Sequence, residues 1–108
     1  MIYELRIYQA VPGRLPALIS RFKNRTLAIW EKHGIRQAGF WTTVIGESNQ
    51  RLTYMLAWDN LADREKRWGA FIADPEWHAT VAETEKDGQL VQNISSELLT
   101  PTSFSSVK

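Results

Sequence analysis

The chain has 108 residues, which is enough for one domain with a core and too few for two. Apolar residues make up 44% of it and the net charge is +1, so neither composition nor charge favours nucleic acid as a partner. There is no cysteine, which excludes disulfides and thiolate chemistry. No segment approaches a membrane span, and Met1 leads directly into a predicted strand. We therefore expect no cleaved leader, no membrane insertion and a cytoplasmic location.

The first predicted strand, residues 2–10, carries the most conspicuous pattern in the chain. Alternation along a strand places Glu4, Arg6 and Tyr8 in one row on one face. This row holds a carboxylate, a guanidinium and a phenol, and a charge pair of this kind is costly if it is buried. The opposite face of the strand carries Tyr3, Leu5 and Ile7.

A helix over residues 14–33 follows, because apolar side chains recur at helical spacing and Gly34 is well placed just after its end. Its basic residues are interpreted as a solvated face; they are Arg14, Arg21, Lys23 and Arg25. The remaining predicted elements are strands over 36–46 and 51–58, a helix over 61–73 capped by Asp59 or Asn60, a helix from an Asp74 cap to about Lys86, and a strand over about 89–99.

This order predicts an α+β fold of the ferredoxin-like class, β-α-β-β-α-β with the second helix split. The single domain spans 1–108, has a four-stranded antiparallel sheet with helices on one face, and ends in an extended tail over 100–108. The middle strands carry bulky residues on both faces, for example Trp41 and Ile45 opposite Phe40. Because a bare face of this kind would aggregate, we predict a homodimer in which two sheets stack.

Seven short blocks spread over the chain carry a family resemblance. They are Tyr3-Glu4-x-Arg6-x-Tyr8, His33-Gly34, Gly39-Phe40-Trp41, Leu52-x-Tyr54-Met55-x-x-Trp58, Arg67-Trp68-x-x-Phe71, Asp74-Pro75-x-Trp77 and Leu98-Leu99-x-Pro101-Thr102-x-Phe104. Together and in this order they resemble the NIPSNAP family of the dimeric α/β-barrel superfamily. The resemblance implies the predicted fold and dimer but no defined reaction. Other branches of that superfamily include cofactor-independent monooxygenases and haem-degrading enzymes.

The row Glu4, Arg6 and Tyr8 is the first candidate ligand site. If Leu5 and Ile7 pack under the helices, the row faces the space between the two sheets of the dimer. Arg6 could then bind a ligand carboxylate in bidentate fashion while Tyr8 donates a hydrogen bond. The alternative is a structural ion pair between Glu4 and Arg6.

Trp68 and His78 form the second candidate site. The haem-degrading relatives pair a helix Trp with a helix His, and they add an Asn on the first strand that this chain lacks. His78 could ligate iron while Trp68 walls a flat cofactor; the alternative is an exposed helix His and a core Trp. His33 is interpreted as a helix-end cation, or else as an acid/base group. We expect no metal site, because the two histidines are far apart and no carboxylates cluster near them.

Two functions remain open at this point. The first is a module that binds a small organic ligand in an aromatic-lined cavity without defined catalysis. The second is a small monooxygenase-type enzyme, either cofactor-independent or linked to haem. No catalytic residue is assigned. A filled core around Trp68 and Phe71 would favour the first function, and an open pocket with convergent polar groups would favour the second.

Overall fold

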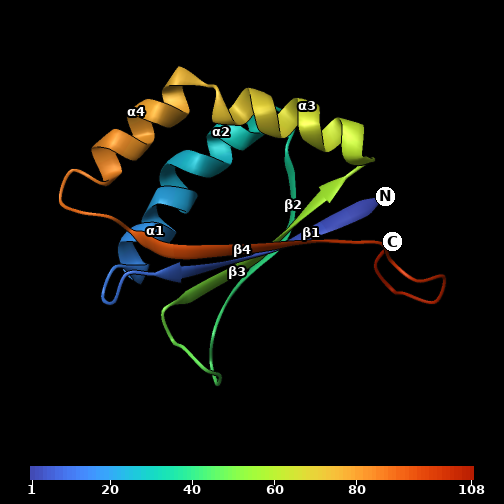
Figure 1. Cartoon of the computed structure of the whole chain (residues 1–108), viewed down its shortest axis with the longest axis horizontal. Coiled ribbons are helices and arrows are strands. Elements are labelled where there is room, and N and C mark those ends of the chain that lie inside the picture. Colours follow the sequence, from blue (N-terminus) through green and yellow to red (C-terminus); the bar gives the residue numbers. More distant parts are fainter.

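The computed structural model describes all 108 residues and shows an antiparallel sheet with every helix on one of its faces (Figure 1). The elements are β1 (Ile2–Ala10), α1 (Leu15–Arg21), the π-helical η1 (Phe22–Thr26), α2 (Leu27–Lys32), β2 (Arg36–Thr42), β3 (Arg51–Trp58), α3 (Leu61–Ile72), α4 (Pro75–Thr84) and β4 (Val91–Leu99). The strand order is β2-β3-β1-β4. The predicted ferredoxin-like α+β fold is confirmed, and the sheet of one chain is open rather than a closed barrel.

The helix ends follow from local sequence. Asn60 caps α3 by accepting a hydrogen bond from the backbone N–H of Asp63 at 2.8 Å. Asp74 caps α4 in the same way, with Pro75 at the first helical position. Gly34 follows α2 with a φ of +70°, a conformation that glycine adopts without strain. Each of these ends was expected from the sequence.

The first predicted helix covers the expected span but contains a π-helical turn, η1. The backbone N–H of Leu27 donates to the carbonyl of Phe22, five residues back. Nothing in the apolar periodicity of the sequence indicated this turn.

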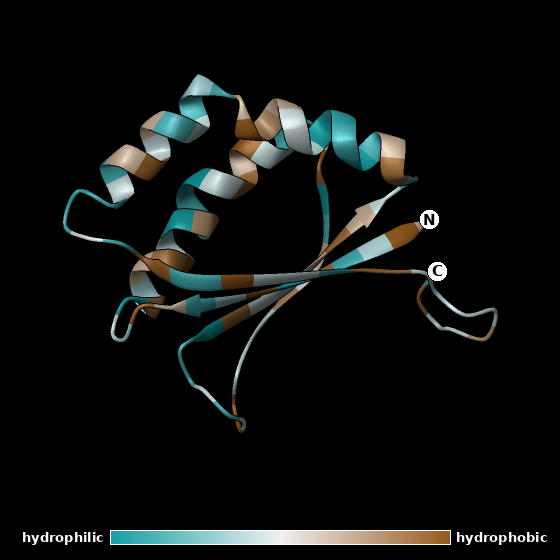
Figure 2. Cartoon of the chain, in the orientation of Figure 1, coloured by the Kyte–Doolittle hydropathy of each residue, from teal (hydrophilic) through white to brown (hydrophobic).

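Strand β2 ends at Thr42, so the prediction that it continues to residue 46 is wrong. Strand β3 begins at Arg51 and offers no pairing partner before that residue, so residues 43–50 form the connecting loop. Val44 and Ile45 are 94% and 95% exposed in this loop, whose tip is hydrophobic in Figure 2.

The two ends of α3 lie outside the core. Leu61 and Ile72, at its first and last positions, are 62% and 46% exposed. Helix α3 reaches the core through its later turns, where Phe71 is buried and Trp68 is half-buried. Helical periodicity alone does not show how far along a helix its contact with the core extends.

The face of β1 that meets the helices is the opposite of the predicted one. The register pairs Glu4 with Leu56, Arg6 with Tyr54 and Tyr8 with Leu52, and all six residues are buried. The expectation that the charged row faces a second sheet is therefore wrong. The open face of β1 instead presents the other row, with Tyr3 buried and Leu5 and Ile7 half-buried.

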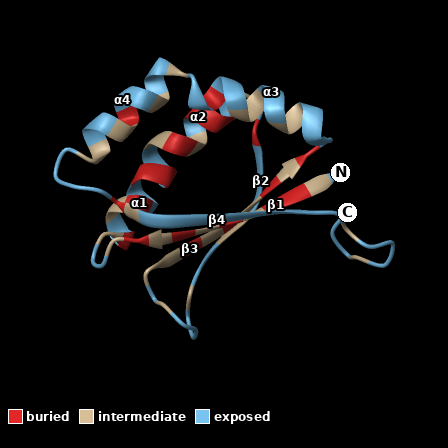
Figure 3. Cartoon of the chain, viewed as in Figure 1, coloured by how far each residue is buried: buried red, intermediate tan, exposed pale blue.

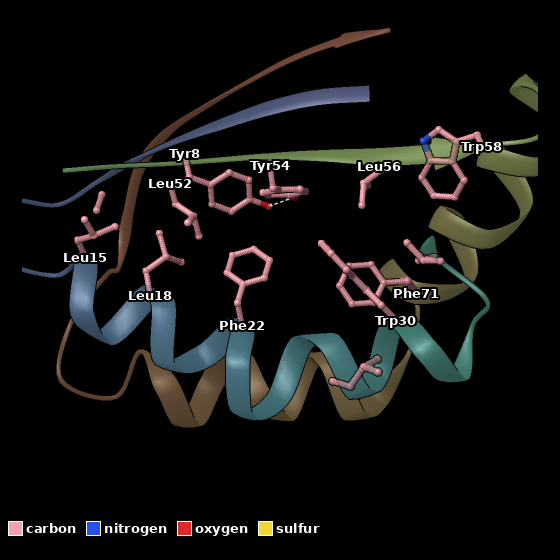
Figure 4. Close-up of a cluster of buried hydrophobic side chains, with 13 residues drawn as sticks. Tyr8, Leu15, Leu18, Phe22, Trp30, Leu52, Tyr54, Leu56, Trp58 and Phe71 are labelled. Carbon is pink, nitrogen blue, oxygen red and sulfur yellow. Dashed lines mark hydrogen bonds between the residues drawn. The ribbon is translucent and has the colours of Figure 1, made fainter. Parts of the chain in front are cut away.

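The core is an aromatic layer between the first helical segments and the centre of the sheet. Figure 4 shows Phe22 and Trp30 pointing from the helices toward Tyr8 and Tyr54 on the strands. The ring of Phe22 lies 5.6 Å from Tyr8 and 5.3 Å from Tyr54 between centroids. Strand β4, by contrast, is exposed along almost its whole length (Figure 3).

Candidate functional site

The carboxylate of Glu4 is the centre of a buried polar cluster. Its two oxygens accept five hydrogen bonds: Oε1 from Arg64 Nε at 2.8 Å and Trp58 Nε1 at 3.0 Å, and Oε2 from Ser96 Oγ at 2.6 Å, Arg6 Nη1 at 3.0 Å and Arg64 Nη2 at 3.2 Å. A carboxylate offers about four lone-pair directions, so this one is saturated. It has no acceptor position left for a ligand.

The surroundings of Glu4 fix its charge. Burial by itself would raise the pKa of this carboxyl group, but the hydrogen bonds from Arg64, Ser96, Trp58 and Arg6 outweigh burial. Together they lower the pKa from its usual 4.5 to about 2. Glu4 is therefore an anion at neutral pH that two arginines balance. This is the arrangement of a structural ion pair and not of a proton donor.

Arg6 is enclosed by aromatic groups. Its Nε donates to the hydroxyl of Tyr54 at 2.7 Å, and its Nη2 donates to the hydroxyl of Tyr8 at 3.3 Å. The guanidinium carbon lies 4.7 Å from the centre of the Trp68 ring, which is a cation–π distance. Burial raises the pKa of Tyr54 well above its usual value, so its hydroxyl stays protonated and donates to Tyr8 at 3.0 Å.

The sequence predicts five residues at two separate candidate ligand sites; the structure brings four of them together and leaves the fifth apart. Glu4, Arg6, Tyr8 and Trp68 belong to one cluster. His78 is exposed on α4, and its Nε2 contacts the carbonyl of Ile72 at 2.6 Å. Trp68 packs against the rings of Trp30, Trp58 and Phe71.

His33 ends α2 as expected and meets the cap of α4. Its Nε2 lies 2.7 Å from Oδ2 of Asp74, which also pairs with Lys32 at 2.6 Å. The hydrogen bond from Lys32 is the main reason that the pKa of Asp74 is lowered. This cluster ties the end of one helix to the start of another.

Sequence reasoning missed two members of the polar cluster. Neither Arg64 nor Ser96 is among the site residues that the sequence predicts. Arg64 precedes Trp68 by one helical turn, so the two share a face of α3. That spacing was a usable signal. Ser96 lies opposite Arg6 in the β1–β4 pairing. Only the strand register reveals this position.

A groove of about 460 Å³ runs between α4 and β4, next to the polar cluster; we call it the α4–β4 groove. It is lined by Tyr8, Arg21, Trp77, Val81, Glu85, Gln89, Val91, Gln92, Asn93 and Ile94. Tyr8 belongs to both features, because its hydroxyl contacts Arg6 and its side chain lines the groove. The groove exists because the helices cover the centre of the sheet and leave β4 exposed.

Arg21 forms part of this groove. The prediction that it lies on a solvated helix face is therefore wrong. It is 6% exposed, pairs with Glu85 at 3.0 Å and lies 5.4 Å from the centre of the Trp77 ring. Its Nε is buried without a hydrogen-bond partner. Helix α4 lies beside α1, and this neighbouring helix converts a helix-surface arginine into a buried one.

No three His, Cys, Asp or Glu side chains come close enough together to hold a metal ion. No helix has both the length and the apolar character needed to cross a bilayer.

The open four-stranded sheet with its helices on one face defines a small α+β protein of the ferredoxin-like class. The sequence profile of the NIPSNAP family matches residues 3–106, and the chain belongs to this family. No match was found among curated proteins.

Solved structures of family members are similar over nearly their whole length. A NIPSNAP family protein of unknown function from Agrobacterium tumefaciens is 26% identical with a TM-score of 0.87, covering 100% of this chain and 94% of that one. A NIPSNAP-like domain protein from Burkholderia xenovorans is 29% identical with a TM-score of 0.84, covering 96% and 87%. A candidate antibiotic biosynthesis monooxygenase from Nitrosomonas europaea is 10% identical with a TM-score of 0.63, covering 94% and 98%, and shares the fold.

Proposed function

We propose that this chain acts as a homodimer that binds a small organic ligand in the α4–β4 groove, without defined catalysis. The observation that carries the proposal is the groove itself. Its volume of about 460 Å³ falls in the range of small-molecule sites, and the sheet and a helix form its two walls. The neighbouring polar cluster is filled, so Glu4 and Arg6 support the groove without contacting the ligand.

The lining of the groove favours an uncharged aromatic or partly apolar ligand. Trp77 and Tyr8 offer aromatic surface, and Val81 and Ile94 add aliphatic surface. Arg21 carries the one positive charge, and its ion pair with Glu85 neutralises it. The amide side chains of the lining can orient polar substituents; they are Gln89, Gln92 and Asn93.

The proposed dimer rests on the open face of the sheet. Trp41 is exposed there and Met55 is half-buried, beside Leu5 and Ile7 of β1. A contiguous apolar face of this kind marks an interaction site in a small protein. A second copy of the same face is the simplest partner, because a two-fold axis pairs each patch with itself.

Calorimetric titration with 1-naphthol, an uncharged aromatic probe, tests the ligand proposal. Val81→Asp places a charge in the groove and should weaken binding at least about tenfold. The matched control is Val44→Asp in the exposed β2–β3 loop, which should leave affinity unchanged. Ile94→Asp on exposed β4 serves as a second groove variant if Val81→Asp does not fold. Equal affinities for the groove and loop variants would contradict the proposal.

Light scattering tests the dimer. The unmodified protein should have twice the mass of one chain at micromolar concentration, and Met55→Asp on the open face should shift it toward the mass of one chain. A monomeric mass for the unmodified protein would contradict the dimer and leave the groove proposal intact.

The monooxygenase-type alternative has the shared fold in its favour, and fold alone is weak support for a reaction. Trp68 is packed among three aromatic rings and Arg6 rather than lining an open pocket. Mixing with hemin separates the two functions, because a Soret shift that His78→Ala abolishes would favour a haem-linked enzyme. Oxygen uptake with 1-naphthol in a metal-free buffer would favour the cofactor-independent form.

A further inference from the structure

A second groove lies at the opposite edge of the sheet, between the first helical segments and β2. Its volume is about 330 Å³. Ile19, Phe22 and Leu27 line it from the helices, and Phe40 and Trp41 line it from the strand. We call it the β2-edge groove. It is more apolar than the α4–β4 groove and has no role in the function proposed above.

The aromatic core separates the two grooves. The ring of Phe22 lies 5.6 Å from Tyr8, which lines the α4–β4 groove, and 5.3 Å from Phe40, which lines the β2-edge groove. Phe40 in turn stacks on Tyr54 at 4.8 Å between centroids. A ligand in one groove therefore does not enter the other, and substitutions can test each groove by itself.

The β2-edge groove carries a single charge. Lys23 is the only charged residue in its lining, and it is exposed with neither an ion pair nor a hydrogen bond to any other residue. The other lysine of this helical segment, Lys32, is paired with Asp74 at 2.6 Å. An unpaired cation beside apolar walls is complementary to a molecule with one anionic end and one apolar end.

The π-helical turn η1 contributes to this arrangement. It supplies Phe22 and Lys23 as its first two residues, one buried and one exposed. In an α-helix, two side chains four residues apart point in directions that differ by about 40° around the helix axis. A π turn holds more residues and reduces that difference, which keeps Ile19, Lys23 and Leu27 along one groove. Turns of this kind inside α-helices occur frequently at functional sites.

Strand β2 leaves one wall open to a ligand. It pairs with β3 alone, so its outer edge has no neighbouring strand. Trp41 is 52% exposed at this edge and folds back over Gly39, where an added Cβ would lie 2.5 Å from the indole. Gly39 has a φ of +120°, which only glycine adopts readily, so the indole position depends on this residue.

We propose that the β2-edge groove binds an amphiphilic monocarboxylate. The apolar chain lies along Ile19 and Leu27 and against the outer edges of the Phe22 and Phe40 rings. The carboxylate pairs with Lys23 at the rim. The apolar walls supply the affinity, and the lysine distinguishes an acid from the corresponding alcohol.

Titration of the full chain with decanoate and with decanol tests this assignment. Lys23→Gln should weaken decanoate binding about threefold, the range of an exposed ion pair, and leave decanol binding unchanged. Lys66→Gln, an exposed lysine of α3 without an ion pair, is the matched control and should change neither. Ile19→Asp should weaken both ligands at least about tenfold.

Three results would overturn the assignment. One is the absence of decanoate binding up to about 1 mM. Another is equal decanoate affinity in Lys23→Gln and Lys66→Gln. The last is a loss of binding with Val81→Asp but not with Ile19→Asp, which would place the ligand in the α4–β4 groove. That result would support the first proposal and reject this one.

Discussion

The centre and the edges of the helix side of the sheet are filled in different ways. At the centre, Glu4 and Arg6 lie in a cluster whose hydrogen bonds are satisfied from β3, β4 and α3. At the edges, beside β4 and beside β2, the helices leave grooves of about 460 and 330 Å³. The most conspicuous charged residues of this small domain are therefore structural, while the space for a ligand lies among less conspicuous ones.

Arg6→Ala should have the largest effect, because it removes one partner of a buried ion pair. We expect a loss of about 3 kcal/mol in the free energy of unfolding, measured by urea denaturation at fixed protein concentration. Arg36→Ala is the control, since Arg36 pairs with Asp59 at 2.8 Å between exposed side chains and should cost less than about 1 kcal/mol. Similar losses in the two variants would mean that the centre is not the closed cluster described above.

Acid should lower the free energy of unfolding mainly through the polar cluster at the centre, and less through the edges. The pKa of Glu4 is about 2 in the folded chain and 4.5 in the unfolded chain, where its hydrogen bonds are lost. Between these two pH values the unfolded chain therefore binds more protons than the folded chain. This contribution to stability is complete above about pH 5 and decreases as the pH falls. Between pH 7 and pH 3 the loss from this group should be about 2 kcal/mol.

The Glu4→Gln variant isolates this contribution from other carboxyl groups, because it removes the titrating group while keeping the side-chain size. Its urea midpoint should change less with pH than that of the unmodified protein over the same range. An identical pH dependence in the two proteins would show that Glu4 does not carry the charge assigned to it.

Gly39→Ala probes the β2 edge. The substitution imposes a φ of +120° on a residue with a Cβ and brings that Cβ within 2.5 Å of the Trp41 indole. We expect a loss of about 1–2 kcal/mol together with a shift in tryptophan emission. Gly69→Ala in α3 is the control, because an added Cβ meets no atom within 4 Å there and alanine favours helix. If Gly39→Ala were as stable as Gly69→Ala, the indole would not depend on Gly39.

Ile45→Ser should have the smallest effect. Ile45 is 95% exposed in the β2–β3 loop, so its replacement should change stability by no more than about 0.5 kcal/mol in thermal unfolding. A loss above about 1 kcal/mol would indicate that this loop is buried in the assembled protein and would extend the proposed dimer contact to it.

Much of the fold could be predicted from the sequence, because local rules decide it. Caps at Asn60 and Asp74 and the turn at Gly34 fix where helices begin and end, and alternation fixes β3 to the residue. The candidate site was predicted in part. Glu4, Arg6, Tyr8 and Trp68 do gather, but on the helix side, and His78 lies apart. The ligand, the dimer and the cytoplasmic location stay predictions.

Periodicity and caps act over a few residues, so the order of elements, the fold class and the family could be predicted from the sequence. Which face of β1 is buried could not, because contacts between distant elements set it. Both of its rows are bulky, and the choice depends on Arg64, Trp58 and Ser96, which lie on three other elements. The two grooves were decided in the same way, because they arise from where the helix layer ends over the sheet. No local pattern encodes that boundary, which follows from how the helices pack together.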